Sequence, residues 1–347
     1  MREFSLRNPF FAKEKNLEKK KGFFIILFSM RFLILFFSVA LLCKVQLSCA
    51  ESSPALELPW VTGPLLTPDP FTPGAGHQTY KPYVYWIKRK SVYDQNWDTQ
   101  PTRHLDALVL EPIFKFGITK RTEIDIVPLA YYKYSQGPHS WELGDLTAFF
   151  ALQLMEDNRL LNWGPLDVKL RLGVQFPIGK YDRLNSKKYK TDIGGYGSWD
   201  PSVALLMGKF FHFDSLHWLT TSWGFVYAFG TPVSIHGISS YGGTRETKGT
   251  VYPGNFWVGY LGMQATLTRH FALAFDLEID HQNKTRFSGK SGGFAPRLPS
   301  SNLFIVAPAI EYNLSAREGI IFGPSITVAG RNAPQLISWV LSMNLRR

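Results

Sequence analysis

The chain has 347 residues with a formal charge of +11, and 15% of its residues are aromatic. Residues 1 to 50 hold nine Lys/Arg and three Asp/Glu, so the rest carries 29 basic and 24 acidic side chains, or +5. That charge is too small to indicate a nucleic-acid partner. Both cysteines, Cys43 and Cys49, lie in the first 50 residues, which excludes disulfides and cysteine-based metal sites from the remainder.

The start of the chain has the pattern of a secretory signal over residues 1–50. Lys19–Lys21, or Arg31 alone, supply the charged region, Phe32–Leu42 the apolar region, and Ser48-Cys49-Ala50 the small-residue cleavage site. Met30 is a second candidate start. We expect Sec-type export and cleavage near Ala50.

Two alternatives stay open for this segment. A retained membrane anchor would need Arg31 in the middle of an apolar span, which is costly. A lipoprotein acylated at Cys49 would need a better match in the three residues before it.

Residues 51–76 contain six of the 22 prolines and little periodicity. They predict a periplasmic N-terminal extension or a plug-like segment without regular structure. No 18-residue apolar run follows, so helical membrane spans are excluded for the rest of the chain.

From residue 77 to residue 347, apolar and polar residues alternate in segments that stop and restart. Within Asp167–Pro177, for example, charged or polar residues take one parity and apolar residues the other. Period 2 places the two sets on opposite faces of a β-strand. The twelve predicted strands are Thr79–Lys88, Leu105–Ile118, Thr122–Tyr134, Gly144–Leu154, Asp167–Pro177, Trp199–His212, His217–Phe229, Phe256–Leu267, Phe271–His281, Asn302–Tyr312, Gly319–Val328 and Gln335–Leu345.

The connections between these segments alternate in length. Thr268–His270 is a short one, whereas 178–198, 230–255 and 282–301 are long and polar; Met155–Pro165 is long but falls on the short side. Short turns at one end and long loops at the other are typical of an outer-membrane barrel. We therefore predict an all-β fold, a transmembrane antiparallel up-and-down β-barrel of about 12 strands. The alternative is a soluble sandwich that buries its apolar face.

The strand parity sorts side chains into two sets. The outward set is Phe114, Phe116, Phe150, Leu152, Leu170, Leu172, Trp223, Phe225, Leu261, Leu277, Ile310, Ile326 and Leu341. The lumen-facing candidates are Glu111, Lys115, Glu123, Asp125, Asp145, Asp167, Lys169, Arg171, Asp276, Glu278, Asp280 and Glu311. Nine acids against three bases predict an acidic lumen, in which the carboxylates form ion pairs with Lys115, Lys169 and Arg171. Such a lumen favours cations or neutral solutes over anions.

The search for catalytic motifs fails. Gly289-Lys290-Ser291 lacks the first glycine and the helix of a phosphate-binding loop, and no Gly-x-Ser-x-Gly elbow or His-x-Ser-Asn-Gly element occurs. His212 and His217 flank a short turn, where a structural role is favoured over metal ligation. We therefore predict no enzyme activity, no catalytic residues, no metal and no cofactor.

Short glycine-containing motifs carry a family resemblance. They are the turn Gly117–Glu123, Gly144-Asp145-Leu146 at the start of a strand, and the run Leu172–Tyr181 at the end of another. With these motifs, residues 75 to 347 resemble the MetA-pathway phenol-degradation family of outer-membrane proteins, distant relatives of barrels that take up hydrophobic compounds. The resemblance implies a barrel that transports aromatic or other hydrophobic molecules, and it supplies no catalytic residues.

The expected function is a porin-like pore or transporter for small molecules in the outer membrane of a Gram-negative bacterium. Its expected partners are membrane lipids, lipopolysaccharide, a small-molecule solute and, during biogenesis, the barrel-assembly machinery, which recognises alternating last strands such as Ile337–Leu345. The alternative is a structural or surface-interaction protein whose basic outer loops meet lipopolysaccharide phosphates or a host surface. An outer-membrane hydrolase is disfavoured.

Overall fold

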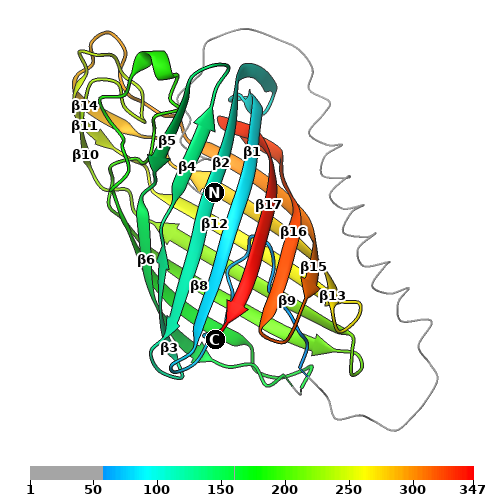
Figure 1. Ribbon diagram of the computed structural model, residues 1–347. Coiled ribbons are helices and arrows are strands. Elements are labelled where there is room, and N and C mark those ends of the chain that lie inside the picture. The colour runs from blue at the N-terminus through cyan, green and yellow to red at the C-terminus, as the bar shows by residue number, and fades with distance from the viewer. Residues whose placement is uncertain (1–57, 160) are drawn as a thin grey trace.

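The protein is a closed, antiparallel β-barrel of twelve spanning strands (Figure 1), as the alternation predicts. The computed structural model describes residues 58–159 and 161–347, so the predicted signal over residues 1–50 lies outside the described residues. The barrel closes because the first strand pairs with both the second and the last. Within the described ranges, no helix is long and apolar enough to cross a membrane.

The spanning strands match the twelve predicted segments, and two of them are each interrupted once. In chain order they are β1 (Gln78–Tyr93), β2 (Thr99–Gly117), β3 with β4 (Thr122–Val127 and Ala130–Tyr134), β5 with β6 (His139–Leu143 and Leu146–Met155), β7 (Asp167–Phe176), β8 (Asp200–His212), β9 (Trp218–Ala228), β12 (Phe256–Thr266), β13 (Phe271–Gln282), β15 (Ser301–Asn313), β16 (Glu318–Arg331) and β17 (Ala333–Arg346).

The two interruptions lie side by side in the wall. Pro128 has no backbone N–H to give to a neighbouring strand, which separates β3 from β4. On the adjacent strand the break between β5 and β6 falls at Gly144 and Asp145. The Gly144 amide still donates to the Leu129 carbonyl at 2.8 Å, so the two halves of the wall stay joined there.

The outer face of the barrel is apolar, as the parity predicts. None of the predicted outward residues is buried, and Leu172, Phe225 and Ile310 are 50%, 50% and 60% exposed. Their inward neighbours Asp276 and Glu311 are fully buried. A closed barrel with its apolar side outward excludes the sandwich alternative, because such a face needs lipid to cover it.

The end with short turns carries one long connection, residues 156–166, which packs against β8. The Asp157 carboxylate accepts from the Phe210 amide at 2.9 Å and forms an ion pair with Lys209. Asn162 exchanges two hydrogen bonds with the backbone of His212, at 2.8 and 2.7 Å. Asp157 and Asn162 thus fix this connection to the end of β8.

At the other end, two of the three long loops form a second small sheet, which stands beyond the barrel rim at the upper left of Figure 1. Its strands pair in the order β10 (Val233–His236), β11 (Lys248–Tyr252) and β14 (Arg286–Lys290), and a short 3₁₀ turn, η1 (Ser186–Lys188), lies in the first loop. We call residues 177–199, 229–255 and 283–300 the outer lobe.

The two faces predict different tolerance to charge. Leu172→Arg places a cation on the lipid side near the middle of β7 and should cost about 2–4 kcal/mol of unfolding free energy. Ser202→Arg, on the paired strand β8 but facing the lumen, should cost far less. Urea titrations in lipid vesicles measure both, and equal losses would contradict the assignment of the faces.

Candidate functional site in the barrel lumen

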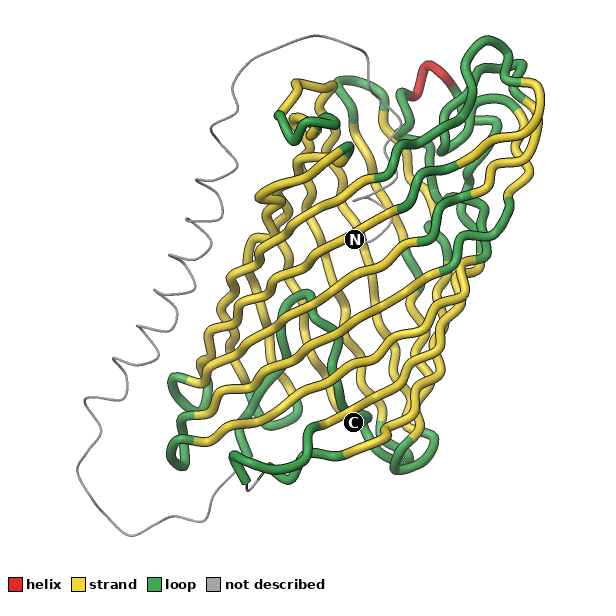
Figure 2. Tube along the Cα trace, turned by 180° about the vertical axis from the view of Figure 1, so that it is seen from behind, coloured by secondary structure: helices red, strands yellow, loops and turns green. Residues whose placement is uncertain are grey.

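The N-terminal segment enters the lumen instead of extending away from the barrel. Of the proline-rich residues 51–76, the structure describes those from Leu58, and Figure 2 shows this stretch as a loop inside the half of the barrel that carries the short turns. We call residues Trp60–Phe71 the plug. Its backbone has no regular structure, so its N–H and C=O groups are free to bond to the wall.

Two lumenal carboxylates hold the plug by its backbone. Asp276 accepts from the amides of Leu65 and Thr67, each at 2.8 Å, and from the Thr67 hydroxyl at 2.7 Å. Glu311 accepts from the Thr62 amide at 2.7 Å. From the sequence, Asp276 was predicted to form an ion pair with Lys115, Lys169 or Arg171. That interpretation is wrong because amide and hydroxyl donors of the plug occupy both carboxylate oxygens.

The plug also contributes an acid of its own. Asp69 Oδ2 lies 2.7 Å from Lys81 Nζ and 2.9 Å from Lys115 Nζ, and all three side chains are buried. An ammonium group left alone in such a place is strongly destabilising, because burial removes its hydration. Asp69 therefore joins the plug to two adjacent strands, β1 and β2, through two buried ion pairs.

Glycines in the wall make room for the plug. A Cβ added at Gly262 would lie 2.7 Å from Pro64 Cγ and 2.8 Å from the Thr67 hydroxyl. A Cβ at Gly208 would lie 2.4 Å from Pro70 Cγ. Real Cβ atoms do not approach so closely, so the seated plug requires glycine on the inner face of β8 and β12.

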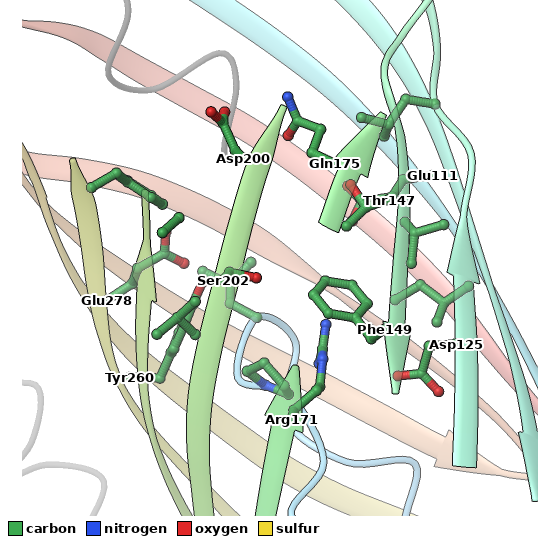
Figure 3. A pocket seen from close by; sticks show the side chains of 18 of the residues that line it. Glu111, Asp125, Thr147, Phe149, Arg171, Gln175, Asp200, Ser202, Tyr260 and Glu278 are labelled. Carbon is green, nitrogen blue, oxygen red and sulfur yellow. The ribbon is translucent and has the colours of Figure 1, made fainter. Parts of the chain in front are cut away.

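Above the plug lies a cavity of about 190 Å³ (Figure 3). Its floor is the plug itself, from Leu65 to Asp69, and Tyr196, Gly230 and Gly254 line it at the outer end. In Figure 3, Glu278 and Asp200 point into it from one side, and Glu111 and Asp125 lie on the other.

The cavity is lined by both apolar and charged side chains. The Arg171 guanidinium carbon lies 3.5 Å from the centre of the Phe149 ring, a cation–π contact that keeps the charge against an apolar surface. Tyr83 and Tyr85 stack at 5.8 Å. Aromatic rings beside a few charges can enclose an apolar solute and still bond to a polar substituent.

The structure places the twelve predicted lumen-facing residues in three groups. Glu111, Lys115, Asp125, Arg171 and Glu278 line the cavity. The second group holds the barrel and the plug: Glu123 is paired with Lys169 at 2.7 Å, Asp276 and Glu311 bind the plug, and Asp280 is buried. The third fixes connections, because Asp167 accepts from the Asp157 amide at 3.0 Å and Asp145 binds the first outer loop.

Asp145 and Lys133 shape the outer end of the lumen. Asp145 accepts from the amides of Gly179 and Tyr196, at 2.8 and 3.1 Å, and Lys133 Nζ donates to the Ile193 carbonyl. These bonds draw the loop inward, so that Tyr196 reaches the cavity. The loop and the plug thus bound the cavity from opposite ends.

Sequence reasoning missed Lys81, Lys133, Asp69 and Asp200. Lys81 could have been found, since it shares the inward parity of Thr79 and Tyr85 on β1. Asp69 carried no signal, because its segment has no periodicity. The cavity is lined by five acids and three bases, a smaller acidic excess than nine to three.

No family model matches the chain, and neither does any curated protein. Among solved structures, the COG4313 outer membrane channel from Pseudomonas putida F1 aligns with a TM-score of 0.60 at 14% identity, over 86% of this chain and 100% of that one. The likeness is one of fold.

Two more distant barrels complete the comparison. The CymD monoaromatic hydrocarbon channel aligns with a TM-score of 0.38 at 8% identity, over 78% of this chain and 88% of that one. The β domain of the Bordetella autotransporter BrkA aligns with a TM-score of 0.40 at 11% identity, over 78% and 99%.

The close contact between Gly262 and the plug predicts that a larger side chain at position 262 displaces the plug from the lumen wall. Residues 51–347 contain no cysteine, so Val61→Cys introduces a single reporter at a buried plug position. Adding Gly262→Leu should raise its labelling rate by a maleimide at least about tenfold, since the leucine overlaps Pro64 and only an unseated plug is accessible.

The matched control is Gly259→Leu, three residues earlier on the same strand and on its opposite face. A Cβ at Gly259 meets nothing within 4 Å, so labelling should stay as in Val61→Cys alone. Equal labelling in both double variants would show that Gly262 does not make room for the plug.

Proposed function

We propose that this protein is an outer-membrane channel that binds small aromatic or hydrophobic molecules in the lumenal cavity and lets them pass when the plug moves. The observation that carries the proposal is the cavity, which lies inside a transmembrane barrel and is floored by a segment held only through non-covalent bonds. Export by a signal cleaved near Ala50 would deliver the chain to that membrane.

Size and lining favour a solute with a single ring. An apolar cavity of about 150 Å³ is known to hold benzene in an engineered protein, and this one measures about 190 Å³. Phe149, Tyr83 and Phe256 provide apolar contact, while Gln175 and Ser202 offer hydrogen bonds. The resemblance to the MetA-pathway phenol-degradation family supports the same class of solute.

The plug favours controlled passage over a permanently open pore. Lys169 Nζ donates to the Phe71 carbonyl at 2.9 Å, and Gln153 donates to the Pro70 carbonyl at 3.1 Å. Together with Asp69 and Asp276 these contacts join the plug to β1, β2, β6, β7 and β13. A solute that leaves the cavity toward the short-turn end has to displace some of them.

A filled cavity should block uptake. Ser202→Trp puts an indole into the cavity, whereas Leu205→Trp, on the same strand, places it on the lipid side. Uptake of radiolabelled toluene by cells that carry the channel should fall at least about fivefold with Ser202→Trp and stay unchanged with Leu205→Trp. Equal uptake in cells with and without the protein would contradict the proposed function.

Charge selectivity gives a second test. Glu278 and Asp200 contribute two of the five acids that line the cavity. The open channel should therefore prefer cations, and Glu278→Gln with Asp200→Asn should weaken that preference. Reversal potentials across a salt gradient, measured with the Gly262→Leu protein in planar bilayers, report it. A channel selective for anions would show that the basic outer lobe controls permeation; no conductance would favour a structural barrel.

A further inference from the structure

The outer lobe is a folded unit with a small core. Val233, Ile235 and Val251 on one face of its sheet are buried, and they pack with Tyr196, Tyr241 and Leu298 from the surrounding loops. The rings of Tyr196 and Tyr241 meet at 5.8 Å in an edge-on arrangement. This packing gives the opposite face of the sheet a fixed geometry.

That opposite face is exposed and basic. Cross-strand pairing places His236, Lys248 and Lys290 in one row, Ser234, Thr250 and Ser288 in the next, and Tyr252 with Arg286 in the third. Lys248, Arg286 and Lys290 are exposed. The face therefore offers three cations with hydroxyl groups between them.

The three cations have no acidic counterpart on the face. Lys248 and Lys290 lie directly opposite each other, an arrangement that destabilises a sheet. None of the three forms an ion pair with a described residue. The whole lobe holds eleven Lys/Arg against three Asp/Glu. Two of these acids have partners: Asp192 lies 3.2 Å from Lys180, and Asp182 lies 3.8 Å from His236 Nδ1.

The position of the basic face indicates which kind of anion it would contact. Its buried side packs on Tyr196, which lines the lumenal cavity, so the exposed side is turned away from the barrel axis. Where the lobe joins the outer ends of β8 and β9, Trp199 and Phe229 are half exposed, and aromatic rings at such positions typically mark the boundary between acyl chains and headgroups. The basic face thus lies beyond this aromatic boundary (Figure 1), on the side where lipid headgroups are expected.

We propose that Lys248, Arg286 and Lys290 bind the phosphate groups of the glycolipid in the outer leaflet, the lipid A headgroup. Ammonium and guanidinium groups bind phosphate oxygens through charge-assisted hydrogen bonds, and Ser288 and Thr250 add hydroxyl donors between them. Arg286 and Lys290 also lie on the edge strand β14, where basic residues discourage pairing with other strands, but that role alone gives no preference for a phosphorylated lipid and does not apply to Lys248 on the central strand.

The test measures binding of fluorescent bisphosphorylated lipid A to the full protein in detergent micelles. Lys248→Gln, Arg286→Gln and Lys290→Gln combined should weaken binding at least about tenfold, because each cation near an anionic headgroup contributes separately. The control removes three exposed cations from the opposite end, with Lys120→Gln, Arg121→Gln and Arg317→Gln, and should leave the affinity unchanged. Unchanged affinity in the first variant would overturn the proposal.

Further measurements distinguish a loss of binding from a loss of folding, and binding of the lipid from binding of any free anion. Lys290→Arg should keep the affinity and Lys290→Glu should lower it more than Lys290→Gln, an order that loss of folding does not produce. Dephosphorylated lipid A should bind weakly. Equal binding of dephosphorylated lipid A, or complete competition by inorganic phosphate or by heparin at matched charge, would overturn the assignment to a lipid phosphate.

Discussion

Charges enclosed in the barrel have to be compensated, and the plug supplies much of that compensation. Asp276, Glu311, Lys81 and Lys115 are all buried in the part of the lumen that the plug fills. Buried carboxylates and ammonium groups without partners would destabilise the fold by several kcal/mol each. The plug compensates buried charges of both signs, because its backbone amides donate to Asp276 and Glu311 and its Asp69 pairs with Lys81 and Lys115.

The fold could be predicted because its signals are local. Period-2 alternation and turn length each need only about ten consecutive residues, and they located every spanning strand and the side of the wall on which Leu172 and Glu278 lie. The interruption at Pro128 was not predicted, because the alternation indicates a single strand over Thr122–Tyr134, although proline cannot donate a ladder hydrogen bond. The plug was different. Leu65 and Asp276 are 211 positions apart, and a proline-rich segment has no sequence pattern from which its contacts with particular wall residues could be predicted. Closure of the barrel creates that contact.

The lumen and the outer lobe use charge in different ways. In the lumen, ion pairs compensate Lys81, Lys115 and Lys169, whose ammonium group lies 2.7 Å from Glu123, so these cations mainly hold the barrel and the plug together. On the lobe, Lys248 and Lys290 face each other across the sheet and their field extends into the surroundings. Tyr196 connects the two regions, because it packs in the lobe core and lines the cavity. A movement of the lobe core would therefore also move Tyr196 at the outer end of the cavity.

The seat of the plug has a consequence for the order of assembly. The plug precedes every strand in the chain, yet its bonding partners Asp276 and Glu311 belong to β13 and β15, among the last strands to be made. The final seam joins β1 to β17, and β1 is only seven residues after Phe71. The plug can therefore form these bonds only after β13 and β15 have been made, so the segment that comes first in the described chain takes its final position late in assembly.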